Sequence, residues 1–207
     1  MKRSRRRPAQ LALTLRARTW GGPRPNAGRP KKAGAGVSHL RRPSLLRRHP
    51  VHVVVRVTRE TWNLRAGRCF RVLQRAFRIA RDRFEMRLCH FSVIGNHLHL
   101  LVEATDERAL SKGMQGLGVR MAKALNRVMK RKGPVYSDRY YARTLKTPSE
   151  VARAMNYVMN NTVKHELIRR GIDPRSSWNA ENDDCVSAAS TWLLRVGWRR
   201  AGPKRAG

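Results

Sequence analysis

Hydrophobic and polar positions alternate in some parts of the chain and recur at helical spacing in others, which divides it into predicted strands and helices. Residues 51–60 alternate, and this predicts a strand that places Val53, Val55 and Val57 on one face. Residues 64–83 set large apolar side chains among many arginines at helical spacing, which predicts an amphipathic helix. The folded part of the chain is therefore expected to begin with a strand and a helix.

The middle of the chain predicts two further strands and a second helix. Residues 84–94 and 97–103 are rich in β-branched and apolar side chains, and the turn-prone pair Gly95 and Asn96 joins them tightly. Residues 106–132 repeat leucine and methionine at helical spacing, with lysine and arginine outside that stripe. Three glycines weaken the first half of this helix.

The last predicted elements are a strand and a third helix. Residues 136–146 predict the strand, and residues 148–169 predict a helix with Pro148 in its first turn that ends before Gly171. The complete order is strand, helix, strand, strand, helix, strand, helix. This order predicts an α+β fold that resembles a ferredoxin-like sandwich, an antiparallel sheet with helices on one face.

Composition predicts two tails around this domain of residues 49–170. Residues 1–48 contain no acidic residue and are dense in glycine, proline and basic residues, so we predict a disordered basic arm. Residues 171–207 form a basic C-terminal extension. Its segment 191–200 predicts a short helix that either docks on the core or contacts DNA.

The charge of the chain points to a polyanionic partner. Lysine and arginine number 46 against 13 aspartate and glutamate residues, giving a formal net charge of +33. Such a surface favours nucleic acid, and no apolar run is long enough to span a membrane. Three cysteines without a close pair fit a reducing cytoplasm, where we expect the protein to associate with the nucleoid. The residues predicted to bind phosphate are Arg29 and Lys31 in the arm and Lys123 and Arg127 on the second helix.

His97 and His99 are the first candidates for chemistry. They lie two residues apart on a predicted strand, so both imidazoles point to the same face while Leu98 turns into the core. This geometry allows the two imidazoles to meet one divalent metal ion. In isolation, such a triplet more often reflects ordinary packing or a surface position than metal binding.

The third helix carries a polar stripe that adds a phenol and an amide. Tyr157 and Asn161 lie four residues apart and therefore side by side on the helix. Arg153 and Lys164 are close to them on the same stripe and could hold phosphate. The stripe thus presents a phenol and an amide oxygen together, with two cations close by.

These two motifs together resemble a known family. The stretches IGNHLHLLVE and YVMNNTVKHEL, the second running from Tyr157 to Leu167, resemble the HUH endonuclease superfamily with a single catalytic tyrosine. More closely, residues 50–170 resemble the IS200-like transposases and the REP-associated tyrosine transposases. The resemblance implies that His97 and His99 are metal ligands, that Asn161 completes the metal site, and that Tyr157 is the nucleophile.

The resemblance also implies a reaction and a substrate. A transposase of this kind uses a divalent metal, Mg²⁺ or Mn²⁺, and cleaves and rejoins single-stranded or hairpin DNA through a 5′-phosphotyrosine. The chain departs from the family pattern at Gly95 and Thr162, where family members usually have proline. Related insertion-sequence enzymes can combine the histidines of one subunit with the tyrosine of another, so monomer and homodimer both remain open.

Two other classes of function compete with this interpretation. The chain could be a DNA-binding protein that descends from such a transposase and no longer cleaves DNA. A four-stranded sheet backed by helices is also the architecture of an RNA-binding module, but the central strand has histidines and leucines in place of the expected aromatic residues. A replication initiator or relaxase of the same superfamily would more often place its histidines after the tyrosine.

The remaining tyrosines and histidines are assigned to structural roles. Core packing or base stacking is expected of the other tyrosines on or near the last strand, which are Tyr136, Tyr140 and Tyr141. Structural or exposed positions are expected of three further histidines, namely His52, His90 and His165.

Overall fold

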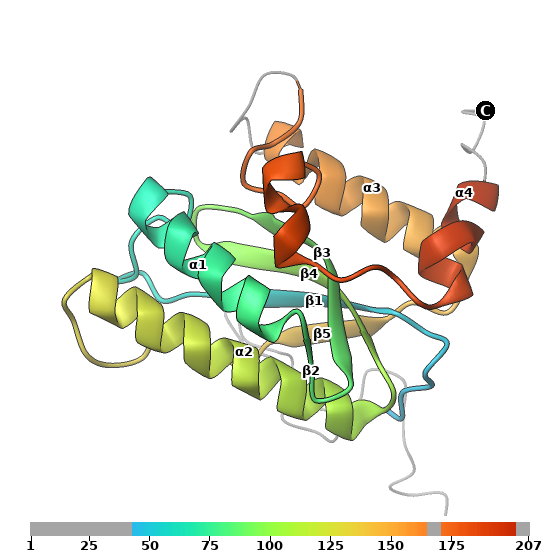
Figure 1. Cartoon of the computed structure of the whole chain (residues 1–207), viewed down its shortest axis with the longest axis horizontal. Coiled ribbons are helices and arrows are strands. Elements are labelled where there is room, and N and C mark those ends of the chain that lie inside the picture. Colours follow the sequence, from blue (N-terminus) through green and yellow to red (C-terminus); the bar gives the residue numbers. More distant parts are fainter. Residues whose placement is uncertain (1–42, 165–170, 202–207) are drawn as a thin grey trace, which may run out of the picture. The chain divides into compact units, whose positions relative to one another are not determined.

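A five-stranded antiparallel sheet organises residues 43–164 and 171–201, which are the residues that this computed structural model describes (Figure 1). The strands lie in the order β2-β3-β4-β1-β5. Their bounds are β1 Val51–Arg56, β2 Asp82–Arg83, β3 Met86–Val93, β4 His97–Ala104 and β5 Tyr141–Thr144. The helices are α1 Gly67–Ala80, α2 Glu107–Val128, α3 Pro148–Lys164 and α4 Trp198–Arg200, with a 3₁₀ turn η1 Ala180–Cys185 and a π-helical turn η2 Leu193–Gly197. The predicted α+β class and antiparallel sheet are therefore confirmed.

One face of the sheet packs against α1 and α2. The alternating valines of β1 put Val51, Val53 and Val55 on this face, where all three are buried. They join a large apolar cluster with the inner sides of α1 and α2. Leu45 is buried in the same cluster, so the packed structure begins before the boundary predicted at residue 49.

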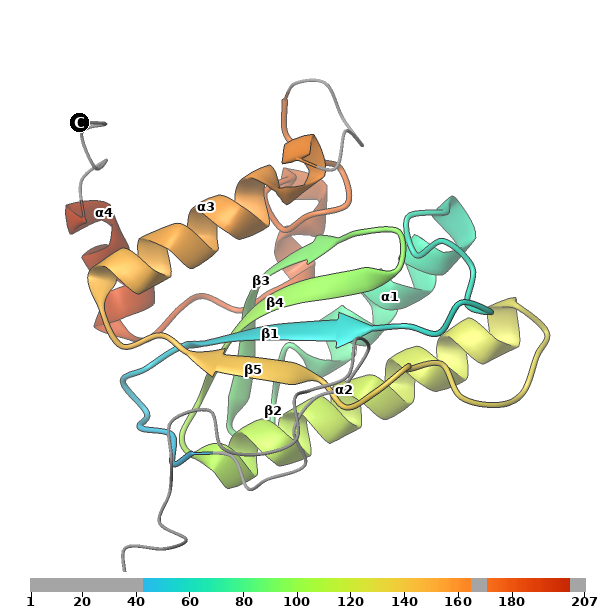
Figure 2. The ribbon, with the colours of Figure 1, turned by 180° about the vertical axis from the view of Figure 1, so that it is seen from behind.

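The third helix lies on the opposite face of the sheet, which differs from the predicted layering (Figure 2). Leu101 of β4 and Cys89 of β3 are buried on that face, where they pack with Val151 and Met155 of α3. The chain therefore builds three layers, with α1 and α2 on one face of the sheet and α3 on the other. The second face of β4 carries Leu101 together with the buried polar side chains of His99 and Glu103, so this face is covered as well.

The strand predicted over residues 84–94 begins two residues later because a tight turn precedes it. Phe84 and Glu85 both have a φ of 58° and connect β2 to β3, a conformation that hairpin turns require. The α2 glycines also have a packing reason, because a Cβ at Gly113 would lie 2.6 Å from the Met86 side chain. The glycine that weakens the helix thus lets it approach the strand.

The strand predicted over residues 136–146 is shorter than expected. Tyr136 makes only an isolated bridge with Val57, and regular pairing with β1 starts at Tyr141. Between them the Asp138 carboxylate accepts a hydrogen bond from the Arg139 amide at 2.6 Å, which stabilises a turn. Of the helix predicted over 148–169, the part after Lys164 lies outside the described residues.

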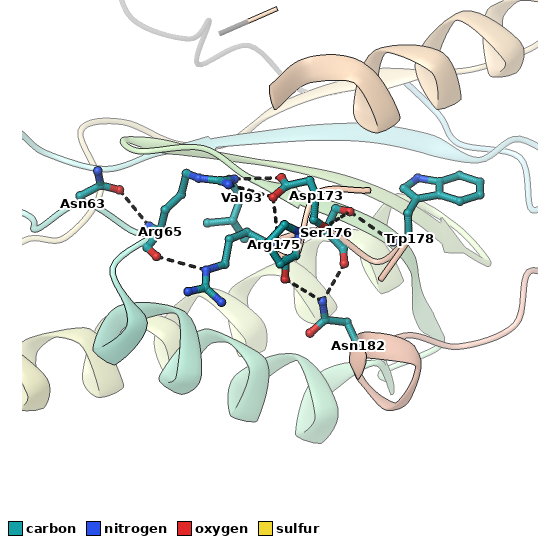
Figure 3. Close-up of polar contacts among 9 residues, drawn as sticks. Asn63, Arg65, Val93, Asp173, Arg175, Ser176, Trp178 and Asn182 are labelled. Atoms are coloured by element: carbon teal, nitrogen blue, oxygen red, sulfur yellow. Dashed lines mark hydrogen bonds and ion pairs between the residues drawn. The ribbon is translucent and has the colours of Figure 1, made fainter. Parts of the chain in front are cut away.

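The segment after Gly171 is held to the sheet by a polar network (Figure 3). The Arg65 guanidinium donates two hydrogen bonds to the Asp173 carboxylate and one to the Val93 carbonyl oxygen, at 2.7 to 2.9 Å. Ser176 forms an isolated bridge with Ser92 of β3. The predicted extension therefore contacts the end of β3 directly.

A second anchor lies further along the same segment. The Glu103 carboxylate of β4 accepts hydrogen bonds from the backbone amides and hydroxyls of Ser190 and Thr191, at 2.7 to 2.9 Å. The following Leu193 and Leu194 are buried in the cluster that includes α3. Of the two roles left open for residues 191–200, the structure shows docking on the core.

No helix in the described part of the chain is long and apolar enough to cross a membrane.

Candidate active site

The histidine pair lies on the face of the sheet that α3 partly covers. Leu98 is buried in the cluster on the other face, as the two-residue period of a strand requires. The rings of His97 and His99 have their centroids 4.8 Å apart with an interplanar angle of 82°. His99 is only 4% exposed, whereas His97 is half-buried at the start of β4. The pair therefore joins an enclosed imidazole to a more accessible one.

Helix α3 brings Tyr157 to this pair. The buried side chains of Val151, Met155 and Val158 fix the helix on the sheet through the cluster with Leu101. This places the Tyr157 ring 5.0 Å from the His99 ring, at an interplanar angle of 81°. The sequence predicted both motifs, and the structure brings the phenol and the imidazole pair together.

His52 also belongs to this cluster, although the sequence analysis gave it a structural or exposed role. Its ring stacks on His99 with centroids 5.3 Å apart and lies 6.1 Å from the Tyr157 ring. The His52 Nε2 and the His99 Nδ1 are hydrogen-bonded at 3.1 Å. The sequence places His52 on the face of β1 opposite to Val53, but only the pairing of β1 with β4 brings it next to His99.

The electrostatic setting of His52 favours its neutral form. Burial and, to a smaller extent, the charge of Arg143 on the neighbouring strand lower the pKa of His52 to about 4. Near neutral pH the ring therefore carries a single proton and keeps one nitrogen as a hydrogen-bond acceptor.

The side chains around the histidine pair provide a limited set of metal ligands. Among the described residues no group of three or more His, Cys, Asp or Glu side chains is arranged to hold one. His97 and His99 can supply two imidazole nitrogens from one face of one strand, which suits a divalent cation whose remaining ligands are oxygens. Asn161 follows Tyr157 by one turn of α3, and its side chain lies outside the described part of the structure.

The predicted phosphate-binding residues fall on different surfaces. Arg153 is exposed on α3, and Lys164 is the last residue of that helix. Lys123 and Arg127 are exposed on α2, in the layer on the other side of the sheet. Arg29 and Lys31 lie outside the described residues. Only the α3 residues are therefore on the element that carries Tyr157.

Lys123 and Arg127 line a groove between α1 and α2. Its cavity volume is about 400 Å³, and Arg75 and Arg120 line it as well. Apolar side chains, among them Ile79, also line it. The groove thus combines four basic side chains with apolar ones.

The other tyrosines differ in their surroundings. The Tyr136 hydroxyl donates to the Gly118 carbonyl oxygen of α2 at 2.6 Å, and burial raises the pKa of this phenol. Tyr140 is partly buried and packs on the apolar cluster of α1 and α2. Tyr141 is 49% exposed and pairs with Val54, so its ring lies on the same face as His99. Tyr136 and Tyr140 therefore have packing roles, whereas Tyr141 presents an exposed ring beside the site.

Comparison with known proteins places these features in a family. The model of the family described as IS200-like transposase matches residues 46–161, which is more than half of the chain. A REP-associated tyrosine transposase solved with a REP hairpin shares the fold, with a TM-score of 0.58 and 14% identity over 69% of this chain and 83% of that chain. A candidate transposase from Deinococcus radiodurans aligns with a TM-score of 0.41 and 16% identity, over 65% of this chain and 97% of that one. No curated protein sequence matches.

Proposed function

Because the chain belongs to the IS200-like transposase family, we propose that it cleaves and rejoins DNA strands with Tyr157 as its nucleophile. The observation that carries this proposal is the position of the Tyr157 ring, 5.0 Å from His99 and on the same face of the sheet as His97. A phenol near imidazoles that could hold a divalent cation suits a covalent attack on phosphate. The family itself establishes a transposase that acts on DNA.

The reaction divides one difficult displacement into two steps. The Tyr157 oxygen forms a bond to the scissile phosphorus while the bond from phosphorus to the 3′ oxygen breaks. The phenol gives up its proton and the departing 3′ oxygen takes one up, which leaves a 5′-phosphotyrosine and a free 3′ hydroxyl. A second 3′ hydroxyl then attacks the phosphotyrosine and releases Tyr157. Each step replaces one phosphoester bond by another, so no ATP is required.

A divalent cation is part of the proposal. His97 and His99 would hold it, and Asn161 would add an amide oxygen. Mg²⁺ or Mn²⁺ bound there supplies Lewis-acid polarisation of the phosphate. The residues of the chain orient the nucleophile. Helix α3 carries the phenol, and the buried Leu101 and Met155 hold that helix on β4, the strand of the histidines.

The substrate proposed is single-stranded or hairpin DNA. The solved neighbour was bound to a REP hairpin, which supports this choice. On this chain, exposed Arg56, Tyr141 and Arg143 lie on the same face as the histidines, because they pair across β4, β1 and β5. Cations and an exposed ring beside the site suit a splayed strand, whose bases can stack on aromatic side chains. Arg153 and Lys164 would hold phosphates from the side of α3.

Further phosphate contacts are proposed away from the site. The groove between α1 and α2 collects Arg75, Arg120, Lys123 and Arg127, which would hold a second part of the same DNA. Arg29 and Lys31 of the basic arm would add contacts that carry no sequence information. Affinity is then spread over the molecule, while cleavage depends on the histidine face.

The test is covalent capture of DNA. End-labelled single strands and hairpins from the sequence that flanks the gene are incubated with the protein and Mn²⁺ or Mg²⁺, then separated on a denaturing gel. We expect a metal-dependent protein-DNA band that Tyr157→Phe and His97→Ala both abolish. Tyr136→Phe is the matched control, since its hydroxyl bonds to α2 on the other side of the sheet, and it should keep the band.

The opposite result would indicate a different function. If the wild type binds these strands with either metal and forms no covalent band on any of them, the chain is a DNA-binding descendant of a transposase. A band that persists in Tyr157→Phe would move the nucleophile to another residue.

A further inference from the structure

Each histidine of the pair has its Nδ1 in a hydrogen bond. The Nδ1 of His97 lies 2.7 Å from the Oδ1 of Asn96, and the Nδ1 of His99 lies 3.1 Å from the Nε2 of His52. Asn96 is the neighbouring residue in the chain, whereas His52 comes from β1, 47 residues earlier. The two partners therefore reach the pair from different elements, and both approach the same ring nitrogen.

The proton on that nitrogen decides what the other nitrogen can do. A neutral imidazole has one N–H group and one lone pair, so a proton on Nδ1 leaves the lone pair on Nε2. A carbonyl oxygen such as the Asn96 Oδ1 only accepts, and it therefore selects the Nδ1–H form of His97. The bond between His52 and His99 can run in either direction, so the proton of His52 determines the form of His99.

We propose that His52 is a positioning residue that accepts a hydrogen bond from the Nδ1–H of His99 and so presents the Nε2 of His99 to a divalent metal ion. This inference rests on the proposed function for the role of His99 as a ligand. Histidines that bind metals usually donate their second ring N–H to a nearby acceptor, which fixes both the tautomer and the ring orientation. Here a third histidine provides that acceptor.

The strand register holds His52 in place for this role. Val54 pairs with His99 and His52 pairs with Leu101, so His52 is the diagonal neighbour of His99 on the same face of the sheet. The two rings stack with an interplanar angle of 25°. Val51 and Val53, on either side of His52, are buried on the opposite face and fix the backbone of β1. The position of the His52 Cα relative to His99 is therefore set by the packing of β1.

Other groups of the candidate site also lie near His52. Arg143 is its cross-strand partner on β5. The Tyr157 ring has its centroid 6.1 Å from that of His52. His52 therefore lies among a cation, the proposed nucleophile and the proposed ligand.

The first measurement is the tautomer of His99 in the metal-free protein, by long-range ¹H–¹⁵N NMR. We expect the wild type to carry the proton on Nδ1. His52→Leu should move His99 toward the Nε2–H form, and His52→Gln should restore the Nδ1–H form because its side-chain carbonyl oxygen accepts. His90→Leu removes another largely buried imidazole from the same sheet and should leave His99 unchanged.

The second measurement is Mn²⁺ affinity by titration calorimetry of the same proteins without DNA. Loss of an orienting partner typically weakens metal binding about 10- to 100-fold, and we expect this for His52→Leu but not for His52→Gln or His90→Leu. A wild-type His99 protonated on Nε2, or a His52→Leu protein with unchanged tautomer or unchanged affinity, would overturn the inference. A wild type that binds no Mn²⁺ would overturn the metal part of the proposed function as well, while the NMR result would still show whether His52 sets the tautomer.

Discussion

Arg65 and Asp173 form a two-point ion pair across 108 residues of sequence, with nitrogen-to-oxygen distances of 2.8 and 2.9 Å. The Asp173 side chain is 1% exposed and that of Arg65 is 14% exposed, so water screens this pair only weakly. Arg65 also donates to the Val93 carbonyl oxygen at the end of β3 (Figure 3). The pair therefore ties the C-terminal segment to the strand beside the one that carries His97 and His99.

We predict that Asp173→Ala strongly destabilises the protein. The substitution leaves the Arg65 guanidinium largely buried without its carboxylate, and breaking a buried pair in this way costs about 3–5 kcal/mol. Urea unfolding followed by circular dichroism measures the loss in the free energy of unfolding. Asp184→Ala is the control, because its ion pair with Arg78 is exposed and should contribute far less. Equal losses in the two variants would contradict the argument from burial.

Glu103→Gln should loosen the segment that follows Val186. The carboxylate accepts four hydrogen bonds from Ser190 and Thr191, and an amide cannot accept all of them. Unmade bonds of this kind cost about 1–3 kcal/mol, so hydrogen exchange at the Ser190 and Thr191 amides should accelerate. Glu85→Gln, whose carboxylate accepts from the Thr105 hydroxyl at an exposed position, should leave these two amides protected.

Periodicity along the sequence predicted most of the fold. The valines of β1 and the apolar stripes of α1 and α2 repeat at the spacing of their elements, so their faces could be read directly. The side of the sheet that α3 covers could not be read in this way. Leu100 and Leu101 are consecutive apolar residues of one strand and point to opposite faces, so the pattern did not show which face a helix covers. Residues of the C-terminal segment were missed for another reason, since single polar residues such as Asp173 show no period.

The candidate site was predictable where its residues carry a motif. His97 and His99 share a face by the period of a strand, and Tyr157 lies on a recognisable helical stripe. His52 was missed because one histidine among valines carries no motif, and only the pairing of β1 with β4 brings it to His99. The predicted roles of the motif residues remain proposals that the covalent-capture experiment tests.

His90 should make the fold less stable at acidic pH. Burial lowers the pKa of His90 to about 4, below the unfolded value of 6.5, so the unfolded chain binds more protons between these two values. This difference in pKa contributes about 3 kcal/mol to the free energy of unfolding above pH 6.5. The contribution is lost as the pH falls toward 4. Urea unfolding at pH 7 and pH 5 should show a smaller decrease for His90→Gln than for the wild type. His49→Gln, at a position near the surface, should behave like the wild type.

Tyr141→Ala should weaken the binding of single-stranded DNA. The ring is 49% exposed on the histidine face, and stacking of one base on an aromatic side chain contributes about 1–3 kcal/mol. Fluorescence anisotropy with a labelled oligonucleotide measures the loss of affinity. Tyr141→Phe retains the ring and should bind like the wild type. If the alanine variant also keeps full affinity, no base stacks on this residue.

The groove between α1 and α2 should contribute to affinity through phosphate contacts. Replacing Lys123 and Arg127 together by alanine removes two of its four cations, which lie on the opposite side of the sheet from Tyr157. Each phosphate contact contributes about 0.7 to 0.9 to the slope of log affinity against log salt, so the slope should become shallower by about 1.4 to 1.8.

The comparison variant takes two other exposed cations of α2, Arg108 and Lys112, which lie outside the groove. Both double variants lower the net charge equally, so a general charge effect would change both slopes by the same amount. A groove that holds the DNA backbone would reduce the slope mainly in the first variant. Because the proposed cleavage site lies on the other face, the rate of covalent-complex formation at saturating DNA should be the same in both. This rate separates binding in the groove from chemistry at Tyr157.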